Sequence, residues 1–96
     1  MQYRVYGKTS DKISVLGYGA MRLPMTDNHV DMDISVAMIR RSIELGVNYL
    51  DTAVGYCGSE SQIAIGKAVK GLRDKVFVST KNHYKGASGD EWQKLL

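Results

Sequence analysis

Runs of strand-forming residues alternate along the chain with segments whose apolar residues repeat at helical spacing, and this alternation constrains the fold more than any other feature. Strand patterns at residues 12–16, 47–53 and 75–80 are each followed by a helix pattern. Two strands joined through a helix pair in parallel, because a short hairpin cannot connect them. The sequence therefore predicts an α/β protein built on a parallel sheet.

The beginning of the chain shows the pattern of a β-hairpin. Residues 2–6 (QYRVY) and 12–16 (KISVL) each alternate apolar and polar side chains, and GKTSD between them contains glycine and aspartate. Two short strands around such a turn are typical of a hairpin. Gly17 and Gly19 then allow close backbone approach, and we expect a loop through residues 24–32.

The first helix is predicted from Asp33 onward, with a backward extension to residue 32. Its apolar side chains recur at intervals of four, three and four residues, as one buried face of a helix requires. They are Met32, Val36, Ile39 and Ile43. Gly46 stands where such a helix would end.

A second helix is predicted to begin at Ser59. Ser59 and Gln62 have the spacing of a capping box, and Glu60 lies where the helix dipole favours an acid. The expected buried stripe consists of Ile65, Ala68, Val69 and Leu72. Gly71 is the expected terminator.

The last part of the chain holds a strand and the beginning of a helix. KVFVST (75–80) is a continuous strand-forming run, of the kind buried on both faces in a parallel sheet. Ser88 and Glu91 have the spacing of a second capping box, and Trp92, Leu95 and Leu96 begin an apolar repeat. A helix of about two turns is marginal alone. We therefore expect a truncated chain, with further strands in the complete protein.

Charge and composition argue against several classes of protein. The 13 basic and 10 acidic residues are interleaved, so the net charge of +3 gives little support to a nucleic-acid partner. No apolar run reaches the about 18–20 residues of a membrane span, and the N-terminus lacks the apolar region of a signal peptide. The single cysteine, Cys57, excludes an internal disulfide and a cysteine-rich metal site. We expect a cytoplasmic protein without nucleic acid, membrane or metal.

Charged residues end two of the predicted strands. Asp51 closes the second strand of the parallel set, Tyr56 follows five residues later, and Lys81 closes the third. The carboxyl ends of neighbouring parallel strands lie about 4.8 Å apart at one edge of a sheet, where functional groups of such folds gather. An ammonium beside a phenol stabilises the phenolate, and a carboxylate keeps the ammonium charged. Tyr56 could then act as a general acid; the alternative is a purely structural Asp51–Lys81 ion pair.

Four segments resemble a known family. VLGYGAMRLP, GVNYLDTAVGY, GSE and VFVSTK, in this order, are similar to the N-terminal part of the aldo-keto reductases, and the resemblance covers nearly the whole chain. LDTAVGY followed by GSE is its most specific part. The resemblance implies a TIM-type (β/α)8 barrel. Residues 2–16 would form a hairpin that caps the bottom of the barrel and overlaps its first strand, and residues 33–96 would carry the first three βα units.

The resemblance also implies catalytic roles. Asp51, Tyr56 and Lys81 match the aspartate, the proton-donating tyrosine and the lysine of the family's catalytic tetrad. The fourth member, a histidine that orients the carbonyl group, belongs at the end of a fourth barrel strand, which this chain does not reach. His83 lies two residues beyond Lys81, and we interpret it as a solvated loop histidine rather than a substitute.

Cofactor contacts are implied in the same way. Gly19, Ala20 and Met21 match the segment after the first barrel strand, which lies against the nicotinamide and ribose of NADPH, or less often NADH. Asp51 is expected to touch the ribose as well. The basic residues that grip the adenosine phosphate in the family belong to later strands.

The resemblance predicts an NAD(P)H-dependent oxidoreductase that reduces aldehydes or ketones to alcohols, with a small carbonyl compound as substrate. The 96 residues alone are expected to be inactive, because three of eight units cannot close a barrel. The alternatives are a non-catalytic regulatory or binding member of the same fold, like the potassium-channel β subunits, or an inactive fragment. Substrate identity, oligomeric state and a C-terminal iron–sulfur cluster, which some relatives carry, are left open.

Overall fold

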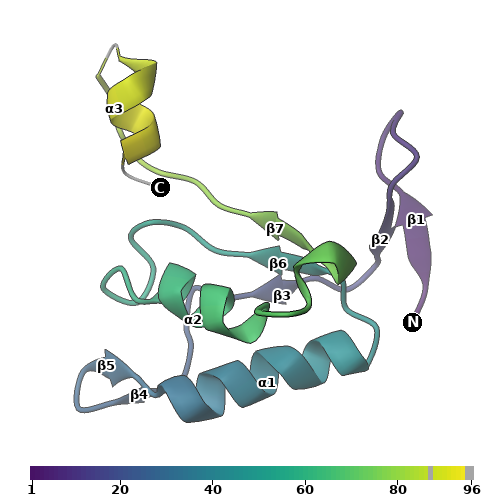
Figure 1. Cartoon of the computed structure of the whole chain (residues 1–96), viewed down its shortest axis with the longest axis horizontal. Coiled ribbons are helices and arrows are strands. Elements are labelled where there is room, and N and C mark those ends of the chain that lie inside the picture. Colours follow the sequence, from purple (N-terminus) through teal and green to yellow (C-terminus); the bar gives the residue numbers. More distant parts are fainter. Residues whose placement is uncertain (87, 95–96) are drawn as a thin grey trace.

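The computed structural model describes residues 1–86 and 88–94. Its centre is a parallel sheet in the order β3 (Tyr18–Gly19), β6 (Tyr49–Asp51) and β7 (Phe77–Ser79) (Figure 1). Helix α1 (Met32–Glu44) connects β3 to β6, and α2 (Ser61–Ala68) lies between β6 and β7. The predicted α/β fold with parallel strands is confirmed.

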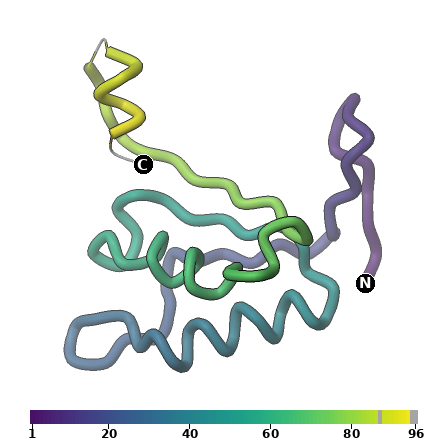
Figure 2. Tube along the Cα trace, in the orientation of Figure 1, coloured from purple at the N-terminus to yellow at the C-terminus, as the bar shows by residue number. Residues whose placement is uncertain are grey.

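The remaining elements flank this centre. Strands β1 (Tyr3–Val5) and β2 (Lys12–Ser14) form the predicted antiparallel hairpin. A short 3-10 turn, η1 (Arg73–Lys75), precedes β7, and α3 (Gly89–Lys94) follows it. Figure 2 shows that the hairpin and α3 project from the body of the molecule at its two ends.

The core lies between the two long helices and the sheet. Ile39 of α1, Leu50 of β6 and Ala64 of α2 are fully buried, and α1 contacts α2 directly. The expected face of α1 is confirmed, because Met32, Val36 and Ile43 pack against this core beside Ile39. Each large aliphatic side chain buried in this way contributes about 1.5–3 kcal/mol.

The hairpin attaches at the amino end of β6 through Asn48. The Asn48 side chain accepts a hydrogen bond from the Ser14 N–H at 2.7 Å and donates one to the Lys12 carbonyl at 2.8 Å. Tyr3 Oη donates to the Gly46 carbonyl at 2.8 Å. The hairpin therefore lies at the opposite end of β6 from Asp51. Its second strand ends at Ser14, separate from β3, which begins at Tyr18.

The segment 24–32 is more ordered than the expected loop. Strands β4 (Met25–Thr26) and β5 (His29–Val30) pair in antiparallel fashion. Asp27 and Asn28 connect them with φ values of 54° and 65°. Two positive φ angles in a two-residue connection define a type I′ hairpin turn, which suits Asp and Asn. The loop prediction was wrong because Asp27 and Asn28 form this turn and bring the residues on either side of it together as strands.

The predicted start of α2 was also wrong. Ser59 has φ 72°, in the left-handed region, and cannot serve as an extended N-cap. The helix begins at Ser61, and its N-cap residue Glu60 makes no capping hydrogen bond through its side chain. Three residues of the expected buried stripe are buried as predicted: Ile65, Ala68 and Val69. Leu72 lies beyond the end of the helix at Ala68 and is half-buried.

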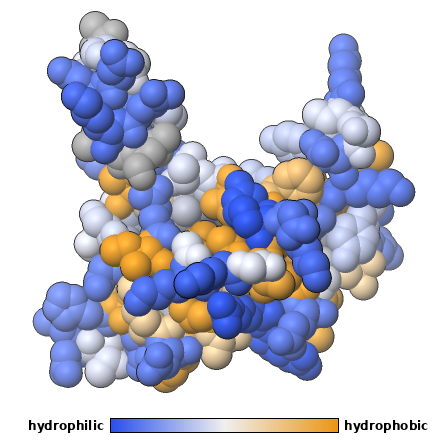
Figure 3. Space-filling view, viewed as in Figure 1, coloured by the Kyte–Doolittle hydropathy of each residue, from blue (hydrophilic) through white to orange (hydrophobic). Residues whose placement is uncertain are grey.

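Strand β7 is not buried on both faces as expected. Val76 before it is buried, but Phe77 is 36% exposed, and Val78 is only partly buried. The reason is that β7 pairs with β6 on one side and with no other strand among the described residues. Figure 3 shows apolar surface over the middle of the molecule in the view of Figure 1, between the more polar hairpin and α3.

The second capping box is seen in part. The Glu91 N–H donates to Ser88 Oγ at 3.3 Å, so Ser88 caps α3 as expected. The Glu91 carboxylate contacts the Tyr84 hydroxyl. Trp92 is 38% exposed, and none of the described side chains of α3 is buried. Leu95 and Leu96 of the expected apolar repeat lie outside the described residues.

Candidate active site at the carboxyl ends of the strands

Parallel pairing places one residue from each strand at the same edge of the sheet. Gly19 of β3 pairs with Asp51 of β6, and Asp51 pairs with Ser79 of β7. The chain continues from β7 to Lys81, whose carbonyl accepts a hydrogen bond from the Val54 N–H at 3.0 Å. This bond keeps the end of β7 aligned with the segment that follows β6.

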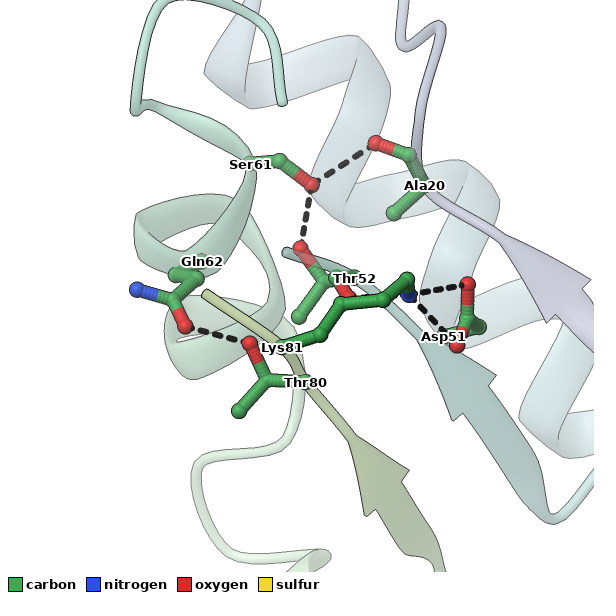
Figure 4. A network of polar contacts seen from close by, with 7 residues as sticks. All are labelled: Ala20, Asp51, Thr52, Ser61, Gln62, Thr80 and Lys81. Carbon is green, nitrogen blue, oxygen red and sulfur yellow. Dashed lines mark hydrogen bonds and ion pairs between the residues drawn. The ribbon is translucent and has the colours of Figure 1, made fainter. Parts of the chain in front are cut away.

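The Lys81 ammonium contacts three groups at this edge. It donates to Asp51 Oδ1 and Oδ2 at 3.0 and 2.9 Å and to the Thr52 carbonyl at 2.8 Å (Figure 4). It also lies over the Tyr56 ring, 5.0 Å from the ring centroid, within the range of a cation–π contact. The structure thus brings together the three side chains that the sequence singled out for catalysis.

The charge of Lys81 is stabilised at this position. The hydrogen bond to Asp51 raises the pKa of the ammonium above its usual value, partial burial opposes this shift, and the Tyr56 phenol adds to it. The side chains of Lys81 and Asp51 are 49% and 40% exposed. An ion pair this open to water adds little to the stability of the fold. The contact of Lys81 with Tyr56 is therefore more informative about function than about stability.

A pocket of about 300 Å³ adjoins this cluster. Its walls are Ala53, Gly55, Tyr56, Lys81, Asn82 and His83. Both polar ends of the Asn82 side chain are engaged, because Nδ2 donates to the Trp92 carbonyl at 2.9 Å and Oδ1 accepts from the Tyr84 N–H at 3.0 Å. His83 is exposed at the pocket, in agreement with a solvated loop histidine.

A larger hollow of about 390 Å³ lies elsewhere, beside the C-terminal half of α1 and the turn before η1. Arg40 and Lys75 contribute to its wall. Arg40 is engaged in capping α2, because its guanidinium donates to the carbonyls of Ala68 and Lys67 at 3.1 and 3.2 Å. This hollow is lined by neither Asp51, Tyr56 nor Lys81, whereas the 300 Å³ pocket is lined by Tyr56 and Lys81 and is therefore the candidate active site.

The three residues expected at the cofactor occupy different environments. Met21 is 48% exposed, and Gly19 is exposed with open space where a Cβ atom would stand. Ala20, by contrast, is fully buried. Its N–H donates to the Asp51 carbonyl at 2.8 Å, and its own carbonyl accepts from Ser61 Oγ at 2.7 Å. The main-chain groups of Ala20 therefore join β3 to β6 and α2.

Sequence reasoning missed a group of polar residues around the strand ends. Thr52 and Ser61 are buried and share a hydrogen bond of 2.7 Å. Thr80 Oγ1 donates to Gln62 Oε1 at 2.6 Å (Figure 4). The Glu60 carboxylate accepts from the Val30 N–H at 3.1 Å and contacts His29 Nδ1 at 3.3 Å. The sequence offered one signal for this group, the hydroxyl residue Thr52 directly after Asp51. The role of Ser61 could not be predicted, because it depends on contacts with residues distant in the chain.

The described residues contain neither a candidate metal site nor a candidate membrane span. No group of three or more His, Cys, Asp or Glu side chains among them could hold a metal ion. In the same part of the chain, no helix combines the length and apolar character needed to cross a membrane.

The sequence model of the aldo/keto reductase family matches residues 15–95. Among curated proteins, an L-galactose dehydrogenase from Arabidopsis thaliana is 36% identical over 84 residues, which cover 84% of this chain and 26% of the relative. This chain thus spans about a quarter of that protein's length.

Solved structures agree with this match. An aldo-keto reductase from Bacillus halodurans, in its holo form, superposes with a TM-score of 0.76 at 33% identity, covering 96% of this chain and 29% of that one. An aldo-keto reductase from Klebsiella pneumoniae in complex with NADPH gives a TM-score of 0.63 at 26% identity, covering 74% of this chain and 24% of that one. The chain therefore belongs to the aldo/keto reductase family.

Proposed function

We propose that this chain supplies part of the active site of an NAD(P)H-dependent reductase that converts aldehydes or ketones to alcohols. The observation that carries the proposal is the position of the Lys81 ammonium, held by Asp51 and lying 5.0 Å from the centre of the Tyr56 ring beside an open pocket. A phenol and an ammonium at one pocket wall can together transfer a proton to the substrate during carbonyl reduction.

In this reaction Tyr56 gives its hydroxyl proton to the carbonyl oxygen of the substrate. A nicotinamide cofactor, when bound, would supply the hydride that adds to the carbonyl carbon; together with the proton from Tyr56, the substrate gains two electrons and two protons in total. Lys81 stabilises the negative charge that then remains on the Tyr56 oxygen. Asp51 keeps Lys81 charged and oriented, and solvent returns the proton to Tyr56 before the next cycle.

The residues at the end of β3 fit a nicotinamide cofactor. A Cβ atom built on Gly19 would meet no atom within 4 Å, so the backbone there leaves room for a flat ring beside Asp51. Met21 offers an exposed apolar side chain next to it. We assign Gly19, Met21 and Asp51 to cofactor contact and Ala20 to support of this surface. The NADPH complex of the Klebsiella pneumoniae relative favours NADPH, with NADH as the alternative.

We further propose that activity needs the remaining units of a TIM-type barrel, including the histidine of the tetrad. The match to about a quarter of the length of a relative supports this view. A suitable protein for the test is a graft in which residues 1–96 replace the matched segment of the Bacillus halodurans reductase. Its folding is checked by circular dichroism, and its Kd for NADPH by fluorescence titration.

The decisive comparison is between Tyr56→Phe and Tyr6→Phe in this graft, with 4-nitrobenzaldehyde as substrate. Loss of a general acid lowers the rate by about 10²–10⁴-fold, so we expect this loss for Tyr56→Phe with NADPH binding retained. Tyr6 lies in the hairpin region and is 58% exposed, so its change should leave turnover as it was. Full turnover by Tyr56→Phe overturns the proposal. A folded graft that binds NADPH without turnover favours the regulatory reading instead.

A further inference from the structure

Two buried hydroxyl groups link the segments that carry the candidate active site. Ser61 is fully buried and Thr52 is 1% exposed. Ser61 Oγ donates to the Ala20 carbonyl at 2.7 Å and lies 2.7 Å from Thr52 Oγ1 (Figure 4). Because the single proton of Ser61 goes to a carbonyl that can only accept, Thr52 must be the donor to Ser61. The chain of hydrogen bonds therefore runs from Thr52 through Ser61 to Ala20.

Each end of this chain of hydrogen bonds lies next to a residue of the candidate active site. Thr52 follows Asp51 directly, and its carbonyl accepts from the Lys81 ammonium at 2.8 Å. Ala20 lies between Gly19 and Met21, which are assigned to cofactor contact, and its N–H donates to the Asp51 carbonyl at 2.8 Å. The Ser61 N–H donates to the Tyr56 carbonyl at 3.2 Å. The Ser61 residue thus contacts both the end of β3 and the loop that carries Tyr56.

That loop, residues 53–60, needs such support. It contains two non-glycine residues with positive φ, Cys57 at 54° and Ser59 at 72°. Residues persist in this sparsely populated region only where surrounding contacts fix them. Within the loop, the N–H groups of Ser59 and Glu60 donate to the carbonyls of Tyr56 and Cys57, each at 3.1 Å. Ser61 and Thr52 anchor this strained loop to the ends of two strands.

We propose that Thr52 and Ser61 are positioning residues that hold the loop bearing Tyr56 at the strand ends through their paired hydroxyl groups. This inference rests on the proposed reductase function for its catalytic consequence. The effect on the loop can be measured without turnover, so the two proposals can fail separately.

The first experiment measures amide hydrogen exchange in the 96-residue chain. Ser61→Ala removes one hydroxyl, and Thr52→Val removes the other while keeping the shape of the side chain; Thr52→Ser keeps the hydroxyl. We expect at least a tenfold faster exchange of the Ser59, Glu60 and Ser61 amides in the first two variants and little change in Thr52→Ser.

Ser35→Ala serves as the matched control. Ser35 is as buried as Ser61, but it lies in α1, and its hydroxyl makes a long hydrogen bond of 3.5 Å to the Pro24 carbonyl. Faster loop exchange in Ser35→Ala of the same size would show a general loss of stability and overturn the proposal. Equal exchange in Thr52→Val and Thr52→Ser would overturn it as well.

The second experiment measures kcat and KM in the graft. A misplaced catalytic group can lower the rate by roughly a hundredfold, so Ser61→Ala and Thr52→Val should lower kcat by about ten- to a hundredfold with little change in KM. Thr52→Ser should retain kcat. A global loss of folding would instead reduce the active fraction, which titration with NADPH reveals. If the unaltered graft neither binds NADPH nor reduces aldehyde, the reductase proposal fails, while the exchange data still decide whether the hydroxyls hold the loop.

Discussion

The Lys81 ammonium contacts three groups at the end of β6 and in the loop that follows it: the Asp51 carboxylate, the Thr52 carbonyl and the Tyr56 ring. The carboxylate is the dominant partner, since it takes two hydrogen bonds and makes the largest contribution to the raised pKa of Lys81. The ammonium therefore stays charged through the neutral range. In our account this fixed charge supports the chemistry of Tyr56.

Replacement of Asp51 should lower the pKa of Lys81 toward or below its ordinary value of 10.5. A raised pKa in the folded chain means that the stabilisation from this contact is fully present below the ordinary pKa and is lost as the pH rises through the raised one. NMR titration of the Lys81 side chain in the unaltered chain and in Asp51→Asn measures the shift. The same titration midpoint in both proteins would contradict the assigned cause.

At the scale of elements, helix ends depend on single backbone positions. Gly46 follows α1 with φ 106°, and a Cβ atom built there would lie 2.9 Å from Met1 Cβ and 3.0 Å from Tyr3 Oη. Gly66 lies inside α2 with open space around it. The two glycines therefore differ in whether the fold requires them.

Gly46→Ala should destabilise the chain by about 1–3 kcal/mol, because alanine is strained at positive φ and crowds the hairpin. Gly66→Ala should stabilise it by about 0.5–1 kcal/mol, since alanine favours a helix interior over glycine. Urea denaturation followed by circular dichroism measures both. A shift of the two midpoints in the same direction would contradict this assignment.

Some helices and strands could be predicted from the sequence, and others could not. Helix α1 was predictable because its apolar residues are strictly periodic and its core contacts follow from that period. Asp51 and Lys81 could be placed at one edge because parallel strands align their carboxyl ends. The start of α2 at Ser61 could not be predicted, since the Ser61 hydroxyl donates a hydrogen bond to the carbonyl of a residue 41 positions away, Ala20. The exposure of Phe77 was missed because burial of a strand depends on neighbours that its own sequence does not reveal.

The whole molecule leaves apolar side chains in contact with solvent. Val15 and Leu16 before β3 are 56% and 60% exposed, and Phe77 of the other edge strand is 36% exposed. Relatives are three to four times longer, as the 26% and 29% coverage of their chains indicates. We propose that further barrel units cover both edges of this sheet, which would also shield the pocket beside Tyr56 from bulk water.

We propose that Tyr56 and Lys81 act as one unit on the proton of the reaction. This is tested by the kcat/KM of the graft for 4-nitrobenzaldehyde with Tyr56→Phe, Lys81→Met and both changes together. Groups that act as a unit lose activity non-additively, so we predict that the double variant is no slower than Tyr56→Phe alone, with each single change costing about a hundredfold or more. Losses that multiply in the double variant, or full activity in either single variant, would contradict the claim.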